Sequence, residues 1–172
     1  MSPDTHTIQP PANLGKPRPV YLPVAIAATI LQRGRYAETW ACAVWLIACF
    51  HGERGHITTD TLIWCLGWYL EWHPKRMQRA LKAFRGSCFL HNETEGVCYL
   101  NGWTTISAAL DLPLSELRRR GRVPLHLTEF NRVLTSLRAV LFQAVTARRS
   151  KAYSKMAQNK FHKPISRAAL HA

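Results

Sequence analysis

The clearest periodic pattern of apolar positions along the chain lies in residues 128–145. Apolar side chains recur there at steps of three and four, which predicts one long amphipathic helix. They are Phe130, Val133, Leu134, Leu137, Val140, Leu141, Ala144 and Val145. Residues 36–50 have a different pattern, because nearly every position from Trp40 onward is apolar. That pattern is typical of a helix buried on all sides.

The middle of the chain predicts a series of short elements separated by glycine and proline. We expect helices over 24–33, 36–50, 60–71 and 73–84, a short strand over 56–58, and a β-hairpin from strands 88–91 and 97–100. A helix over 104–112 and one helical turn over 115–120 follow. Trp64 and Trp68 on the 60–71 helix, with Trp72 just past its end, form an aromatic stripe that is expected to be core, with base stacking as the alternative.

The predicted helix over 73–84 divides into two chemically distinct faces. Met77, Ala80, Leu81 and Phe84 share one face and suit packing against the preceding helices. The opposite face carries cations with a glutamine beside them: Lys75, Arg76, Gln78, Arg79 and Lys82. An arginine can fork onto guanine and a glutamine onto adenine in the major groove. The alternative is an ordinary amphipathic surface helix.

The order of elements over residues 36–103 resembles that of a winged helix-turn-helix DNA-binding domain. It runs helix, short strand, helix, tight turn, helix, hairpin, and covers under half of the chain. The resemblance implies a mainly α fold with a small β-hairpin, in which a winged-helix-like core is extended by additional C-terminal helices. It implies that Lys75, Arg76, Gln78 and Arg79 read DNA bases. The predicted hairpin tip carries Glu93 and Glu95 and no cation, so we expect a short, passive wing.

Charge adds a second, separate signal. The chain holds 23 Lys and Arg against 10 Asp and Glu, a formal net charge of +13. Residues 1–117 are nearly neutral, whereas residues 118–172 contain 13 Lys or Arg and one acid, Glu129. Such asymmetry favours a polyanionic partner, with a solvated tail as the alternative. The expected phosphate contacts are Lys82, Arg118, Arg119, Arg120, Arg122, Arg148, Arg149 and Lys151.

These patterns divide the chain into four predicted parts. Residues 1–23 are a proline-rich flexible arm, and residues 24–113 form the winged-helix-like domain. Residues 114–150 hold a basic loop and the long amphipathic helix, and residues 151–172 are a basic C-terminal arm. Residues 163–170 resemble the opening of a second helix-turn-helix.

We therefore expect a protein that binds double-stranded DNA in transcription regulation or replication initiation, plausibly of a phage or plasmid. Two alternatives stay open. The basic arm is also suited to RNA in a ribonucleoprotein. The apolar face of 130–145 also suits a protein-interaction or inhibitor module, or a homodimer through Phe130, Leu134, Leu137 and Leu141.

Other classes of function find little support in the sequence. No P-loop or GxGxxG motif occurs, carboxylates are scarce, and we expect no enzyme activity and no cofactor. Cys88 and His91 lack further ligands at paired short spacing, so we expect no metal site. Five cysteines without a CxxC pair indicate a reducing, cytoplasmic location, nucleoid-associated if the source is bacterial. We expect no signal peptide and no membrane span.

Overall fold

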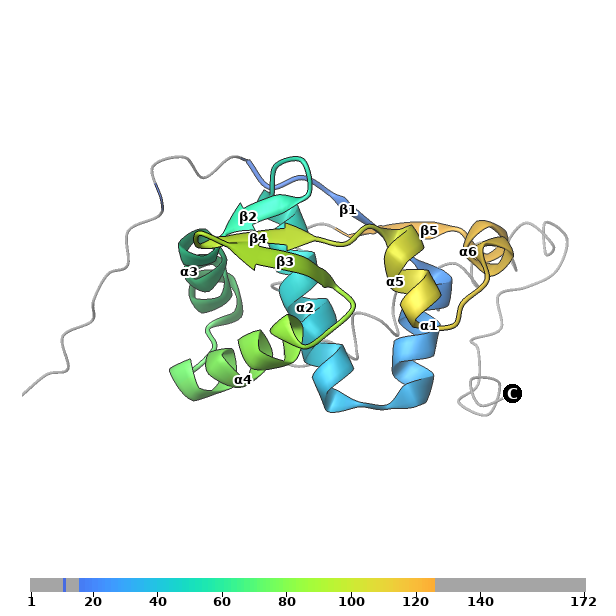
Figure 1. The fold of residues 1–172 in the computed structure, drawn as a ribbon, viewed down its shortest axis with the longest axis horizontal. Helices are drawn as coiled ribbons and strands as arrows, with labels where there is room; N and C mark the ends of the chain where they lie inside the picture. Colours follow the sequence, from blue (N-terminus) through green and yellow to red (C-terminus); the bar gives the residue numbers. More distant parts are fainter. Residues whose placement is uncertain (1–10, 12–15, 126–172) are drawn as a thin grey trace, which may run out of the picture.

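The described part of the chain is mainly helical, with short strands in two small sheets (Figure 1). The computed structural model describes Pro11 and residues 16–125. The mainly α prediction is confirmed for these residues. The predicted helix over 128–145 and the basic C-terminal arm lie outside them. Within the described residues, no helix is both long and apolar enough to cross a membrane.

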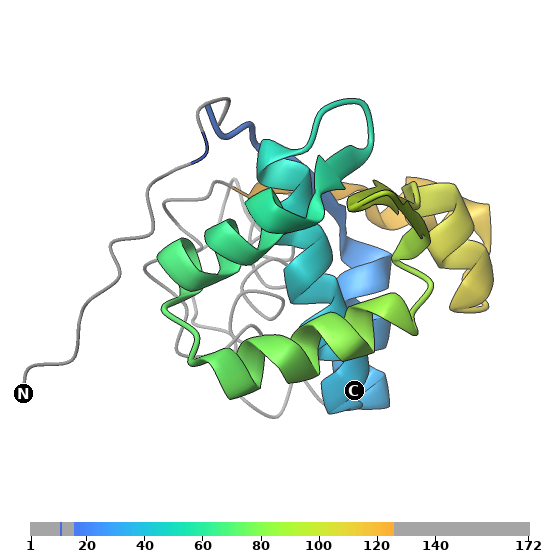
Figure 2. The same cartoon turned by 60° about the vertical axis from the view of Figure 1, so that its left-hand side comes forward.

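Helix α2 (Tyr36–His51) forms the centre of the fold, as its apolar pattern predicted. Ten of its residues are buried, because other elements pack around it on several sides. Helix α1 (Val24–Arg33) lies along one side, and α3 (Thr59–Leu70) and α4 (Pro74–Arg85) lie along the other (Figures 1 and 2). Phe50 of α2, Phe84 of α4 and Phe89 fill the core between them.

A three-residue connection joins α3 to α4. Helix α3 starts at a Thr58 cap, whose hydroxyl accepts a hydrogen bond from the Thr61 N–H at 3.2 Å. It ends at Glu71, which adopts the left-handed conformation at φ 47°. His73 then caps α4, and Pro74 takes the first helical position, where a missing N–H costs nothing.

A three-stranded antiparallel sheet covers one end of α2 and α3. Its strands are β2 (His56–Thr58), β3 (Leu90–Thr94) and β4 (Val97–Leu100), in the order β2-β4-β3. The predicted hairpin is confirmed, but its first strand is shifted: it runs over 90–94 rather than 88–91. The turn is therefore only Glu95–Gly96, both at positive φ, as a type I′ hairpin turn requires.

The shift moves Glu93 out of the hairpin tip and into β3. The tip itself lies against the scaffold, because the Thr59 N–H donates to the Gly96 carbonyl at 2.7 Å. Thr58 pairs with Val97 at the same end of the sheet. The hairpin consequently does not extend beyond the first turn of α3, and it is as short as the sequence predicts.

A second sheet was not predicted. Strand β1 (Val20–Pro23) pairs antiparallel with β5 (Arg122–Leu125), so the last residues of the predicted flexible arm lie in a sheet. Val20, Leu22 and Leu125 bury their side chains on its inner face. Each strand has four residues and contains a proline, which is too short a pattern to show a period of two.

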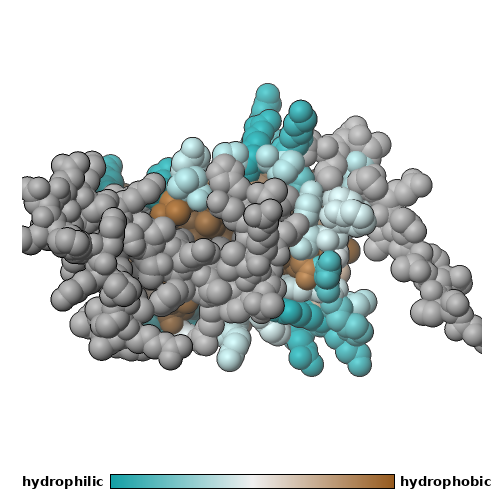
Figure 3. Space-filling view, turned by 180° about the vertical axis from the view of Figure 1, so that it is seen from behind, coloured by the Kyte–Doolittle hydropathy of each residue, from teal (hydrophilic) through white to brown (hydrophobic). Residues whose placement is uncertain are grey.

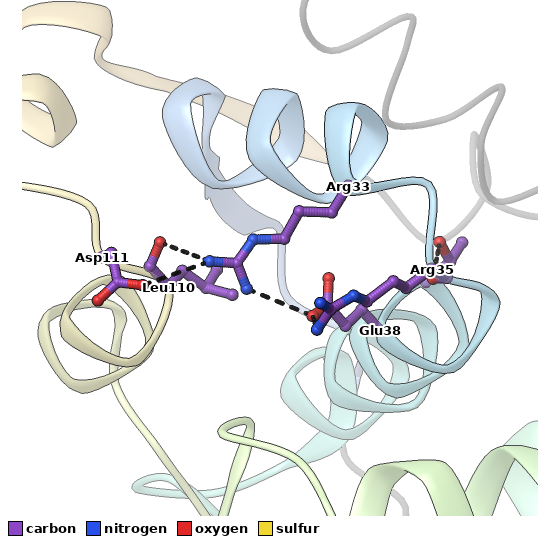
Figure 4. A network of polar contacts seen from close by, with 6 residues as sticks. Arg33, Arg35, Glu38, Leu110 and Asp111 are labelled. Atoms are coloured by element: carbon purple, nitrogen blue, oxygen red, sulfur yellow. Dashed lines mark hydrogen bonds and ion pairs between the residues drawn. The ribbon is translucent and has the colours of Figure 1, made fainter.

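Helices α5 (Trp103–Ala109) and α6 (Leu114–Arg120) connect the hairpin to β5. Arg33 at the end of α1 joins them to the helical core (Figure 4). Its guanidinium donates to the Leu110 carbonyl at 3.1 Å and forms ion pairs with Glu38 at 3.4 Å and Asp111 at 3.7 Å. The Val24 N–H also donates to the Gly121 carbonyl at 3.0 Å. Residues 114–125 are thus bound to α1 and β1.

Candidate nucleic-acid interface

Helix α4 divides into a buried and an exposed face, as its sequence predicted. Ala80, Leu81 and Phe84 are at most 8% exposed and pack toward α2 and α3. Met77 is half-buried on the same face, and its methyl group lies near Gly67 of α3. The predicted base-reading residues Lys75, Arg76, Gln78 and Arg79 are all exposed, and so is Lys82. The apolar face holds the helix in place while its cations meet solvent.

The cations of α4 differ in how they are engaged. Among the residues that the structure describes, Lys75, Arg79 and Lys82 form no ion pair, so their charge is available to a partner. Figure 3 shows hydrophilic side chains gathered over α4 at the lower right. Uncompensated cations on a rigid helix are suited to contact phosphates or base edges.

Arg76 is engaged by an aromatic ring of the α3–α4 connection. Its guanidinium carbon lies 4.8 Å from the centre of the Trp72 ring, within the range of a cation–π contact. Trp72 is only 6% exposed, so it is a fixed support. This contact positions Arg76 at the N-terminal end of α4.

Arg85, at the end of α4, is neutralised by Glu93 of the hairpin. Arg85 Nε lies 2.7 Å from Glu93 Oε2, and the second guanidinium nitrogen lies 3.1 Å from Oε1. The Thr59 hydroxyl also donates to Glu93 at 3.0 Å. The hydrogen bond from Arg85 is the main cause that lowers the pKa of Glu93. Glu93 therefore joins three elements of the scaffold and does not present a free negative charge near α4.

The arginines at 118–122 form a second cationic surface, around the end of α6. All four are exposed, as expected for phosphate contacts: Arg118, Arg119, Arg120 and Arg122. Glu116 binds two of them, with Arg119 at 2.9 Å and Arg120 at 3.0 Å. The hydrogen bond from Arg119 is the main cause that lowers the pKa of Glu116. Arg118 and Arg122 form no ion pair with a described residue.

The two cationic surfaces are not contiguous. Helix α4 packs on α2 and α3, whereas α6 packs on α1 and α5. Figure 1 shows α4 and α6 at opposite ends of the described part, with α2 and α1 between them. The predicted base-reading residues of α4 and the predicted phosphate contacts at 118–122 therefore lie on separate surfaces of the described part.

The tryptophan stripe of α3 is mostly core, as predicted. Trp64 is 7% exposed and Trp72 6%. Trp68 departs from the prediction, since it is 60% exposed. Its ring stacks on that of Trp64 with 5.7 Å between the ring centres.

The five cysteines of the described part are free thiols. Burial raises the pKa of Cys65 to about 12, and it also raises the pKa of Cys42, so both thiols stay protonated at neutral pH. Within residues 16–125 no three His, Cys, Asp or Glu side chains converge as metal ligands. The remaining predicted phosphate contacts, Arg148, Arg149 and Lys151, lie outside the described residues, as does the predicted dimer face.

Comparison of the chain with protein-family models, with curated proteins and with solved structures found no match.

Proposed function

We propose that this chain binds double-stranded DNA, with α4 as the recognition helix of a winged helix-turn-helix unit. The observation that carries the proposal is the exposed face of α4. It presents Lys75, Arg79 and Lys82 without ion pairs to described residues, on a helix whose other face is buried. A recognition helix needs this division between a docked apolar face and a free cationic one.

The topology around α4 supports the same proposal. Elements α2, β2, α3, α4, β3 and β4 follow one another in the order of a winged-helix domain. In the sheet order β2-β4-β3, strand β2, which follows α2, lies beside β4, the second strand of the hairpin. The three-residue connection between α3 and α4 has the length of a helix-turn-helix turn.

The N-terminal end of α4 supports a role in reading bases. Recognition helices contact base edges mainly through their N-terminal residues. Lys75 and Arg76 lie in the first turn, and Trp72 fixes the direction of Arg76. The short hairpin tip carries Glu95 and no cation, so this proposal assigns it no groove contact.

The biological setting follows as part of the proposal. A small DNA-binding unit with a basic continuation suits transcription regulation or replication initiation in the cytoplasm, in a phage, plasmid or similar element. RNA binding and protein interaction remain the alternatives, and the residues that would carry them lie outside the described part.

A salt series on duplex DNA tests the proposal. We expect the full chain to bind a duplex of roughly 20 base pairs, about two helical turns. The logarithm of the binding constant should fall linearly with the logarithm of salt concentration, by about 0.9 for each phosphate contacted. Failure to bind any duplex below about micromolar at low salt contradicts the proposal, because nonspecific binding of basic proteins already reaches that range.

A matched pair of variants identifies the surface involved. Arg79→Gln removes a cation from the exposed face of α4, and we expect weaker duplex binding with a smaller salt slope. Arg54→Gln removes an exposed cation from the turn before β2, on the opposite side of the fold from α4 (Figure 1). It should leave duplex binding unchanged. Equal losses in both variants contradict the assignment to α4.

A further inference from the structure

The two-stranded β1–β5 sheet has an outer face whose chemistry differs from that of α4. On its inner face Val20, Leu22 and Leu125 are buried. On its outer face Tyr21 lies opposite Pro124, and its ring is 54% exposed to solvent. About half of the surface of Tyr21 is therefore open to a partner.

Arg122 lies on the same face of the sheet as Tyr21, and Arg18 lies in the segment that precedes β1. Arg122 pairs with Pro23 and is therefore a diagonal neighbour of Tyr21 across the strands, a spacing of about 7–8 Å between backbone positions. Arg18 precedes Tyr21 by three residues, about 10 Å of extended chain. Both are exposed, and neither forms an ion pair with a described residue.

The sheet is also free of acidic residues and rigidly attached. Residues 16–23 and 122–125 contain no Asp or Glu. The Arg18 N–H donates to the Phe50 carbonyl at the end of α2, and the Val24 N–H donates to the Gly121 carbonyl, both at 3.0 Å. These bonds fix both ends of β1 to the helical core, so Tyr21 and Arg122 keep their spacing.

We propose that this outer face, defined by Tyr21, Arg122 and Pro124, binds a single-stranded nucleic acid. The Tyr21 ring stacks on an unpaired base, while Arg122 contacts a neighbouring phosphate. Stacking needs an unpaired base, because the bases of a duplex are already stacked on one another. The face adjoins the arginines of α6 and lies apart from α4 (Figure 1), so it is a site separate from the duplex contact proposed above.

Binding of a labelled oligothymidine of about 10 nucleotides to the full chain tests this proposal. Tyr21→Leu retains an apolar side chain on the strand but removes the aromatic ring, and it should weaken single-strand binding at least about fivefold. Tyr21→Trp should retain or increase the affinity, because the stacking surface is kept. Tyr36→Leu is the matched control: Tyr36 is 68% exposed at the start of α2 and should have no effect.

Photocrosslinking with an oligonucleotide that carries 5-iododeoxyuridine locates the contact directly. We expect the crosslinked peptide to contain Tyr21. Crosslinks only within residues 126–172 or on α4, or equal losses for Tyr21→Leu and Tyr36→Leu, overturn the proposal. A loss of duplex affinity in Arg122→Gln with no effect of Tyr21→Leu on the single strand also overturns it, since the face would then be a phosphate contact only.

Parallel titration with duplex DNA separates this proposal from the one on α4. Arg79→Gln should weaken duplex binding and leave oligothymidine binding unchanged. Tyr21→Leu should have the opposite pattern. Duplex binding without any single-strand binding by the native chain refutes the β1–β5 proposal alone, and single-strand binding without duplex binding refutes only the α4 proposal.

Discussion

The guanidinium of Arg76 lies over the indole ring of Trp72, 4.8 Å from its centre, and this contact fixes the first turn of α4 to the turn before it. Arg76 therefore has two expected roles: it stabilises the fold through Trp72, and in the proposed function it contacts DNA. Arg79, one turn further along the same exposed face, has no ion pair with a described residue.

The stability role of Arg76 is measurable in the absence of DNA. We expect Arg76→Gln to lower the free energy of unfolding by about 0.5–1 kcal/mol, the usual range for an exposed cation–π contact. Arg79→Gln should change it by less than about 0.5 kcal/mol, as is typical of surface positions. Urea denaturation of the two variants checks this, and equal effects would show that the Trp72 contact adds no stability.

Base reading and phosphate contact can be told apart by the sequence dependence of binding. We expect Arg79→Ala to cost about 1–3 kcal/mol on a duplex selected for tight binding, and much less on random duplex. Arg118→Ala removes an exposed cation from α6. It should change the affinities for the selected and the random duplex by the same factor. The affinities of both variants for selected and random duplexes distinguish base reading from phosphate contact. Equal losses for Arg79→Ala on the two would reduce α4 to a phosphate contact.

The features that the sequence predicted correctly are local ones. The bounds and the two faces of α4 followed from apolar positions at helical spacing, with a proline at the start and a glycine at the end. The central position of α2 followed from an apolar run without a polar face. In both cases residues within one helix carry all of the information.

The features that it missed depend on residues far apart in the chain. Strand β1 pairs with β5, which lies about 100 residues later in the sequence. Each strand has only four residues, too few to show the alternation of apolar and polar positions that predicts a strand. Glu93, which lies in β3 rather than at the hairpin tip, contacts Arg85 and Thr59 on two other elements. The separation of α4 from α6 is likewise a property of tertiary packing, which charge counts along the chain do not contain.

Glu93 should make stability depend on pH in the acid range. Its pKa is lowered in the folded chain, mainly by the hydrogen bond from Arg85. The folded state therefore holds a proton on Glu93 less tightly than the unfolded state does. Its contribution is present above the ordinary glutamate pKa, about 4.3, and is lost as the pH falls through the lowered folded value.

The variant Glu93→Gln isolates this contribution. We expect it to lower the free energy of unfolding at pH 7 by about 1 kcal/mol, near the upper end for exposed ion pairs. The difference between Glu93→Gln and the native chain should shrink below about pH 4. Glu95→Gln is the control, because Glu95 in the hairpin turn forms no ion pair with a described residue. A difference between Glu93→Gln and the native chain that does not change with pH would contradict the role of Arg85.

Arg33 should hold the α5–α6 region to the helical core. It donates to the Leu110 carbonyl and pairs with Glu38, whose side chain is only 19% exposed. We expect Arg33→Gln to lower the free energy of unfolding by about 1–2 kcal/mol, because it removes a hydrogen bond from a charged donor and leaves Glu38 less well compensated. Arg35→Gln is the matched control, since the Arg35 side chain is 70% exposed and contacts the same carboxylate at 3.4 Å. Equal losses in thermal or urea unfolding would show that the contact with Leu110 adds nothing.

Glu116 should limit the affinity of the α6 arginines for nucleic acid. One carboxylate accepts hydrogen bonds from both Arg119 and Arg120 at 2.9–3.0 Å, so part of their charge is compensated within the chain. Glu116→Gln removes that charge and releases both guanidinium groups. We therefore expect tighter binding to the nucleic acid that meets this surface, with a salt slope steeper by about one phosphate. Glu53→Gln makes the same change of net charge at an exposed position before β2 and should have a smaller effect on the slope. If the two variants change the slope equally, the gain comes from net charge alone, and Arg119 and Arg120 do not contact phosphates.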